Sequence, residues 1–96
     1  MPAYILLLKY TEAGIKNIKQ SPSRLDAARK AFKEHGAELK DFYLVTGQYD
    51  AVCTCEVPND ETLARLMLSI GSQGNVRTET LRAFTEAEYR KITSGL

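Results

Sequence analysis

Apolar residues gather along this chain in four short runs that are typical of β-strands. The first run is almost uninterrupted, and the next two are rich in β-branched, aromatic and cysteine residues. The fourth run is more polar and less regular. The pattern predicts four strands, at about residues 3–10, 39–46, 49–57 and 75–84.

Between these runs, apolar side chains recur every three or four residues, as on one face of an amphipathic helix. Ser21 is placed to cap a first helix over about residues 22–35, since Pro22 fits the first helical position and Gly36 can end the helix. Asn59-Asp60 is placed to cap a second helix over about residues 61–70, before Gly71.

Two shorter segments also carry helical spacing. Thr85 precedes an acidic turn that predicts a short C-terminal helix. Residues 11–20 carry Ile15 and Ile18 and predict a short, lid-like turn between the first strand and the first helix. Long connections of this kind often carry function.

The order β-α-β-β-α-β predicts an α+β, ferredoxin-like fold with a four-stranded antiparallel sheet. Strands one and three would form the centre, and both helices would cover one face. The first strand is apolar on both of its faces, whereas a strand with one wet face would alternate apolar and polar residues. We therefore expect a homodimer, with higher oligomers possible, in which the uncovered sheet faces pack together.

Length and charge limit the number of domains and the classes of partner that we expect for this protein. The 96 residues predict one domain, residues 1–96. The chain has 13 Lys and Arg and 12 Asp and Glu. The basic residues form no block of the kind that neutralises phosphates, so nucleic acid is not an expected partner. No apolar run approaches the ~20 residues that cross a bilayer, which predicts a cytoplasmic protein without membrane contact.

Cysteine and histidine suggest neither a metal site nor a cofactor. Cys53 and Cys55 stand two apart on one strand, so they share a face without forming an easy disulfide. No histidine lies near them to complete a metal site, and free cysteine is commonly a small buried apolar residue. His35, the only histidine, falls in the last turn of the first helix, where helix capping is favoured over catalysis.

The segment Gly47-Gln48-Tyr49-Asp50 separates the second and third strands and predicts a hairpin. Gly47 tolerates the positive φ that tight turns need, and Asp50 can accept hydrogen bonds from turn amides. The same residues place a phenol and a carboxylate at a sheet edge, so Asp50 is either a structural turn residue or a ligand-binding residue. Tyr49 is either an amphipathic residue at a dimer edge or a substrate-orienting group.

The fourth strand is unusually polar. Arg77, Glu79 and Arg82 form either an ion-pair network with neighbouring strands or subunits, or an anion clamp based on the guanidinium groups of Arg77 and Arg82. Lys9 and Arg24 are further possible contributors. The predicted ligand site therefore contains Tyr49, Asp50, Arg77 and Arg82.

The turn, together with Glu56-Val57-Pro58-Asn59-Asp60-Glu61 and residues 74–85, resembles the GYD domain family, named for its Gly-x-Tyr-Asp segment. Residues 14–19 and 21–25 are similar to the family as well, so the resemblance covers essentially the whole chain. It implies the dimeric α/β-barrel superfamily, but no general biochemical activity. Residues 45–50 also resemble a turn in the effector-binding domains of leucine-responsive-type regulators, which bind amino acids at subunit interfaces.

Without a helix-turn-helix segment, that second resemblance implies a stand-alone sensing or binding module, which is the favoured function. The ligand would be a small organic molecule, either anionic or a neutral or zwitterionic amino-acid-like compound. A small cofactor-free enzyme of the oxygenase or isomerase type is the alternative implied by the barrel superfamily. A purely structural oligomerisation protein is the third hypothesis. Catalytic residues cannot be named, because the chain has one histidine and no familiar catalytic constellation.

Overall fold

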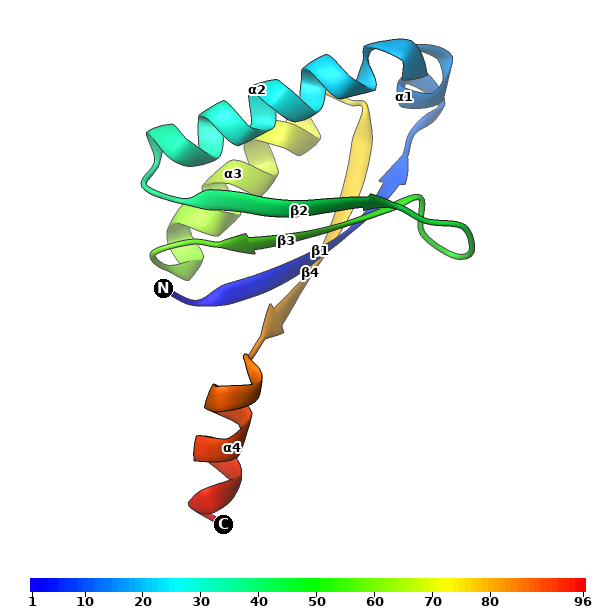
Figure 1. Ribbon diagram of the computed structural model, residues 1–96. Helices are drawn as coiled ribbons and strands as arrows, with labels where there is room; N and C mark the ends of the chain where they lie inside the picture. Colours follow the sequence, from blue (N-terminus) through cyan, green and yellow to red (C-terminus); the bar gives the residue numbers. More distant parts are fainter.

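A four-stranded sheet with helices on one side forms the body of the protein in a computed structural model that describes residues 1–96 (Figure 1). The elements follow in this order: β1 (Ala3–Tyr10), α1 (Glu12–Lys16), the 3-10 turn η1 (Ile18–Gln20), α2 (Ser21–Glu34), β2 (Glu38–Leu44), β3 (Ala51–Glu56), α3 (Asp60–Ser72), β4 (Val76–Ala83) and α4 (Glu86–Ser94).

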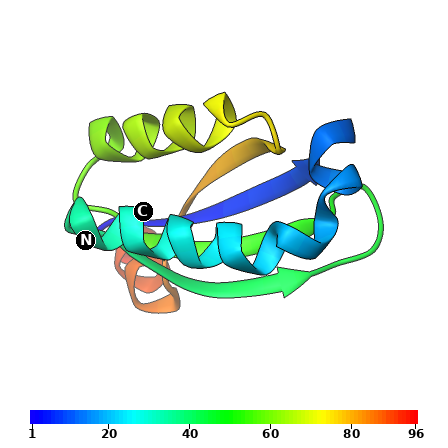
Figure 2. The same cartoon turned by 90° about the horizontal axis from the view of Figure 1, so that it is seen from above.

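The sheet is antiparallel and has the order β2-β3-β1-β4, so β1 and β3 are the central pair. Both long helices, α2 and α3, lie over the same face, and the view from above shows them side by side (Figure 2). The α+β, ferredoxin-like prediction is therefore confirmed. None of the helices is both long and apolar enough to span a bilayer.

The main core lies between this face and the two helices. Tyr4 and Leu6 of β1 point toward the helices, opposite Cys55 and Cys53 of β3. Phe32 of α2 is completely buried among them. A register shift in β2 turns both Leu39 and Phe42 toward the same core, although they stand three residues apart.

The other face of the sheet carries no helix, and we call it the open face. Ile5 and Leu7 of β1, Val52 of β3 and Leu81 of β4 lie across its centre. Ile5, Leu7 and Val52 are only half-buried, and 44% of Leu81 is exposed. An apolar centre on an uncovered sheet face has the composition of a contact surface.

Several predicted boundaries were wrong by one or more residues. Ser21 does not cap α2, because its backbone is already helical and η1 runs directly into the helix. Gly71 does not end α3, which continues to Ser72, because this glycine keeps an ordinary helical conformation. β2 ends at Leu44 and β3 begins at Ala51, which leaves a six-residue connection instead of a tight turn. The expected lid-like turn over 11–20 is α1 followed by η1.

Helix α4 projects away from the body of the protein (Figure 1). Thr85 and Glu88 form the predicted capping box, which satisfies the first N–H groups of the helix. The radius of gyration is 14.4 Å, whereas a compact chain of this length would have one of about 12.5 Å. Tyr89 and Ile92 on α4 are consequently exposed.

Candidate functional site

The connection between β2 and β3 is closed by a backbone hydrogen bond from the Val45 N–H to the Asp50 carbonyl, 2.9 Å long. Gly47 has φ +123° at its tip, in the region that favours glycine. A Cβ added to Gly47 would meet no atom within 4 Å, so only the backbone conformation requires glycine here. The positive φ predicted for Gly47 is confirmed.

We expect Gly47→Val to lower the free energy of unfolding by about 1–3 kcal/mol, because a β-branched residue is strained at positive φ. Urea unfolding with a two-state fit measures the change. An unchanged midpoint would contradict this expectation and show that the connection adopts another conformation without loss.

Asp50 is turned toward the end of β1. Its N–H donates to the Leu8 carbonyl over 2.8 Å, and its carboxylate accepts the Tyr10 N–H over 2.9 Å. β3 pairs with β1 only as far as Leu8, so the Tyr10 N–H lies beyond the last paired residue of β3. The carboxylate replaces the missing strand there, so Asp50 has a structural contact, but with an amide of β1 instead of the turn amides expected from the sequence.

Tyr49 lies on the open face beside β4. Its hydroxyl donates a hydrogen bond to the Glu79 carboxylate, and this bond raises the pKa of Tyr49 above its ordinary value. The Lys9 ammonium lies 5.4 Å from the centre of the Tyr49 ring. The phenol is therefore protonated at neutral pH and is poorly suited to act as a base.

Lys9 of β1 and Arg77 of β4 occupy directly opposite positions on neighbouring strands. Both side chains are exposed, and neither makes an ion pair or a hydrogen bond within the chain. Like charges directly opposite each other in a sheet are destabilising. With Tyr49 and Glu79, these residues form what we call the charged cluster, which holds two cations and one carboxylate.

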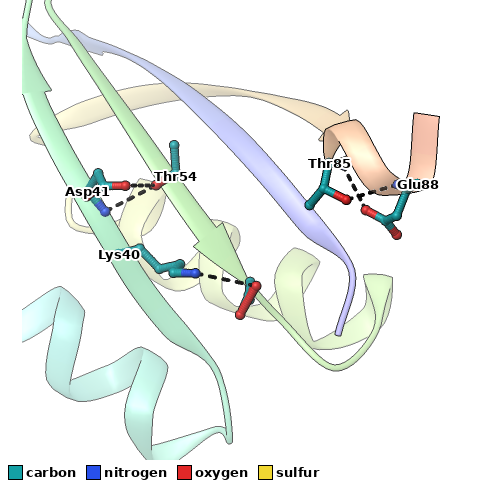
Figure 3. A network of polar contacts seen from close by, with 6 residues as sticks. Lys40, Asp41, Thr54, Thr85 and Glu88 are labelled. Atoms are coloured by element: carbon teal, nitrogen blue, oxygen red, sulfur yellow. Dashed lines mark hydrogen bonds and ion pairs between the residues drawn. The ribbon is translucent and has the colours of Figure 1, made fainter. Parts of the chain in front are cut away.

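The far end of the open face differs, because its charges are satisfied (Figure 3). Lys40 pairs with Glu56 over 3.5 Å, and the Thr54 hydroxyl donates to the Asp41 carboxylate over 3.0 Å. The unpaired cations of this face therefore lie at one end only.

The structure separates Arg82 from the other predicted ligand residues. Arg77 and Arg82 stand five residues apart, roughly 17 Å along the strand, on opposite faces of the sheet. Arg82 donates to the Ala3 carbonyl and stacks 4.4 Å from the Phe84 ring centre. β4 also makes no ion pair within the chain, so an ion-pair network could only involve another subunit.

The other candidate side chains have local structural contacts. Arg24 donates to the carbonyls of Asn17 and Gly14, which ties α2 to the α1 segment. The His35 ring Nδ1 donates to the Ala31 carbonyl over 2.9 Å, at the C-terminus of α2. This end of α2 leads into β2, whereas the 45–50 connection follows β2, so His35 lies a strand length, about 23 Å, from Asp50.

Cys53 and Cys55 are free thiols buried on the same face of β3, as predicted. Burial raises the pKa of each thiol to about 11. Both are therefore uncharged at neutral pH and serve as small apolar core residues. No group of three or more His, Cys, Asp or Glu side chains gathers at one point in the structure.

The sequence indicates two members of the charged cluster only weakly. It suggests Lys9 as a further possible contributor to the anion clamp and Glu79 only as part of an ion-pair network. The opposition of Lys9 and Arg77 follows from the register between β1 and β4, which a single sequence does not specify. A cation near the end of an otherwise apolar strand was the one available signal for Lys9.

The similarity to known proteins extends over nearly the whole of this chain. A curated relative from Thermus thermophilus, named glutamine synthetase and cystathionine beta-lyase binding protein, is 33% identical over 89 residues, which are 92% of this chain and 94% of the relative. A crystal structure of a Thermus thermophilus protein superimposes with a TM-score of 0.56 and 29% identity, over 88% of this chain and 95% of that one.

A feast or famine regulatory protein from M. tuberculosis, solved with L-methionine, superimposes with a TM-score of 0.67 over 88% of this chain. The match covers only 51% of the regulator, at 19% identity, so it shows a shared fold. The family model described as the GYD domain matches residues 4–93, which include α2, α3 and the whole sheet except Ala3, the first residue of β1. This chain belongs to the GYD domain family.

Proposed function

We propose that this protein is a homodimeric small-molecule-binding module that holds an anionic or zwitterionic ligand at the charged cluster, at the edge of the interface between two open faces. The observation that carries the proposal is the opposition of Lys9 and Arg77 without a carboxylate partner. A bound carboxylate or phosphate would relieve their repulsion, and the planar Arg77 guanidinium can bind such a group through two hydrogen bonds.

The position of Asp50 supports an anionic group in the ligand. A free carboxylate beside the cations would repel an anion, but this one is directed at the Tyr10 N–H. Tyr49 and Glu79 remain available to orient a ligand ammonium or hydroxyl group. Of the four predicted ligand residues, Tyr49 and Arg77 contact the ligand, Asp50 holds the connection in place, and Arg82 lies outside the site.

Binding is favoured over catalysis by the same geometry. Tyr49 and His35 are not gathered in one site, and the raised pKa of Tyr49 makes it a weak candidate for a base. The charged cluster has no nucleophile beside a general base. A binding module needs only charged and hydrogen-bonding groups in fixed positions, and the charged cluster provides such groups.

The dimer part of the proposal rests on the apolar centre of the open face. We expect the wild-type protein to sediment at twice its chain mass of 10.7 kDa at micromolar concentration. Leu7→Glu should produce monomers, because it places a charge at the centre of the buried contact. Leu68→Glu is the matched control, since Leu68 on α3 is 76% exposed and lies away from this face. Monomeric wild-type protein in sedimentation equilibrium would refute the dimer.

Thermal-shift measurements with L-amino acids, acetate and phosphate test the ligand site. We expect at least one of these compounds to raise the Tm of the wild type in a concentration-dependent manner. Arg77→Met should weaken that response at least about fivefold, since it removes a charge-assisted contact. Arg65→Met is the matched control, because Arg65 is an exposed arginine on α3.

Equal ligand responses in wild type, Arg77→Met and Arg65→Met would remove Arg77 from the site. Asp50→Asn separates the two readings of Asp50. If Asp50 only holds the connection, Asn should leave ligand affinity unchanged in protein that still folds as a dimer. A dimer that responds to no compound in any variant would favour the purely structural function.

A second candidate function is binding to a metabolic enzyme. The Thermus thermophilus relative is named for binding glutamine synthetase and cystathionine beta-lyase. In this chain, α4 projects with Tyr89 and Ile92 exposed, as a helix that docks on a partner would. Biolayer interferometry with each purified enzyme tests this function. A complex that Tyr89→Ser/Ile92→Ser weakens would support it, and no binding to either enzyme would exclude these partners.

A further inference from the structure

A cavity of about 120 Å³ lies between α2, α3 and the helix-covered face of the sheet. Leu8 and Tyr10 of β1 and Thr78 of β4 line it, and they alternate along their strands with Lys9 and Arg77. Successive side chains of a strand point to opposite faces. The cavity is therefore separate from the charged cluster, on the other side of the sheet.

The core is packed unevenly around this cavity. Toward the start of β1, residues such as Tyr4, Leu6 and Phe32 are almost completely buried. Toward the end of β1, the apolar residues packed against that core are only half-buried, and Leu8, Leu25, Phe42, Met67 and Ile70 all line the cavity. The cavity therefore lies toward the end of β1, and the buried Leu6 and Phe32 form part of its inner wall.

Small side chains on α2 account for the cavity. Ala27, Ala28 and Ala31 line the cavity, at positions where a leucine would extend into it. The cavity opens to solvent, because Ala27, Ser69 and Gln73 in its lining are exposed. Protein interiors are normally close-packed, so the apolar part of this lining lacks the contacts that a filled core would give it. The lining runs along α2 from Ser21 to Phe32, so the cavity follows most of the length of this helix.

The lining is apolar with a few polar groups. Fifteen of its 21 residues are hydrophobic, and Arg24 is the one charged residue among them. The Arg24 guanidinium already donates to two backbone carbonyls. Burial raises the pKa of the lining Cys53 thiol to about 11, so that group is uncharged. The Tyr10 hydroxyl and the side-chain amides of Gln73 and Asn75 make no hydrogen bond within the chain.

We propose that this cavity is a second ligand site, which takes a small uncharged aromatic or branched aliphatic molecule with one hydrogen-bonding group. A cavity of roughly 150 Å³ lined by aliphatic and aromatic side chains holds benzene, so about 120 Å³ suits a group near that size. An ionised ligand would lose solvation without gaining a free counter-charge. The unpaired polar groups of Tyr10, Gln73 and Asn75 are available to a single hydroxyl or amide on the ligand.

Titration of the full-length protein with p-cresol, followed by NMR chemical shifts, tests the site. We expect saturable binding, with the largest shifts at residues that line the cavity, and weaker binding of toluene, which lacks the hydroxyl group. Ala28→Leu and Ile70→Phe fill the cavity from α2 and from α3. Each should weaken p-cresol binding at least about tenfold, because the added side chain occupies the ligand volume.

Ala64→Leu is the matched control, since Ala64 is exposed on α3 and does not line the cavity. It should bind p-cresol as the wild type does, and so should Arg77→Met, whose change lies on the other face. Absence of p-cresol binding to the wild type would overturn the proposal, as would unchanged affinity in whichever filling variant folds. Filling variants that gain stability while the wild type binds neither compound would identify the cavity as a packing defect.

Discussion

Gly14→Ala should destabilise the protein by about 3 kcal/mol or more, although alanine is the better helix former. Gly14 lies in α1 and is buried against the segment before β4. A Cβ at this position would come within 2.0 Å of the Asn75 backbone carbonyl oxygen, which is far inside any allowed contact. Because the obstacle is backbone, either α1 or the start of β4 must move. Equilibrium urea unfolding measures the loss.

Gly71→Ala is the matched control for this substitution. Gly71 also lies in a helix, α3, but a Cβ there would meet no atom within 4 Å. Helix propensity alone therefore applies, and the variant should gain up to about 1 kcal/mol. The two substitutions are chemically identical and are expected to have opposite signs. A stabilising Gly14→Ala would show that α1 does not pack against Asn75 as described.

Phe32→Ala should lower the free energy of unfolding by about 3–5 kcal/mol, because it removes a completely buried aromatic side chain from the centre of the core. Folding stabilities of small domains are only about 5–15 kcal/mol, so this variant is expected to be near the limit of folding. Thermal unfolding followed by circular dichroism gives a first measurement. Phe32→Leu should recover most of the loss, since it restores much of the apolar volume.

Leu68→Ala is the control for core burial. Leu68 is also a large apolar residue on a long helix, but it is 76% exposed. Its substitution should change the stability by no more than about 0.5 kcal/mol. A comparable loss in both variants would mean that Leu68 is covered in solution, which would place a further contact surface on α3.

The elements themselves were predictable because local patterns specify them. The nearly continuous apolar run of β1, the 3.6-residue spacing in α2 and α3 and the capping box before α4 each act within a few residues. Their boundaries were less predictable. Ser21 resembles an N-cap, but the preceding turn η1 already supplies helical backbone, so the capping geometry is absent.

The candidate site was predicted only in part, because the side chains that meet there depend on the register between strands and on the face of the sheet that each side chain occupies. Tyr49 and Arg77, two of the predicted ligand residues, both lie in the charged cluster, and their part in ligand binding stays a prediction. Arg82 was grouped with Arg77 because both are arginines on one strand. However, their offset of five positions is odd, which places them on opposite faces of the sheet and roughly 17 Å apart along the strand.

The sequence by itself determined the order of the elements, the ferredoxin-like fold, the family and the glycine at the tip of the 45–50 connection. These properties follow from short-range periodicity, from turn chemistry and from short motifs distributed along the chain. Tertiary structure alone decided that Asp50 faces the Tyr10 N–H, that Lys9 opposes Arg77 and that a cavity remains beside Ala28. Each of these depends on how distant strands and helices align, and strand register and side-chain packing are set by the whole chain.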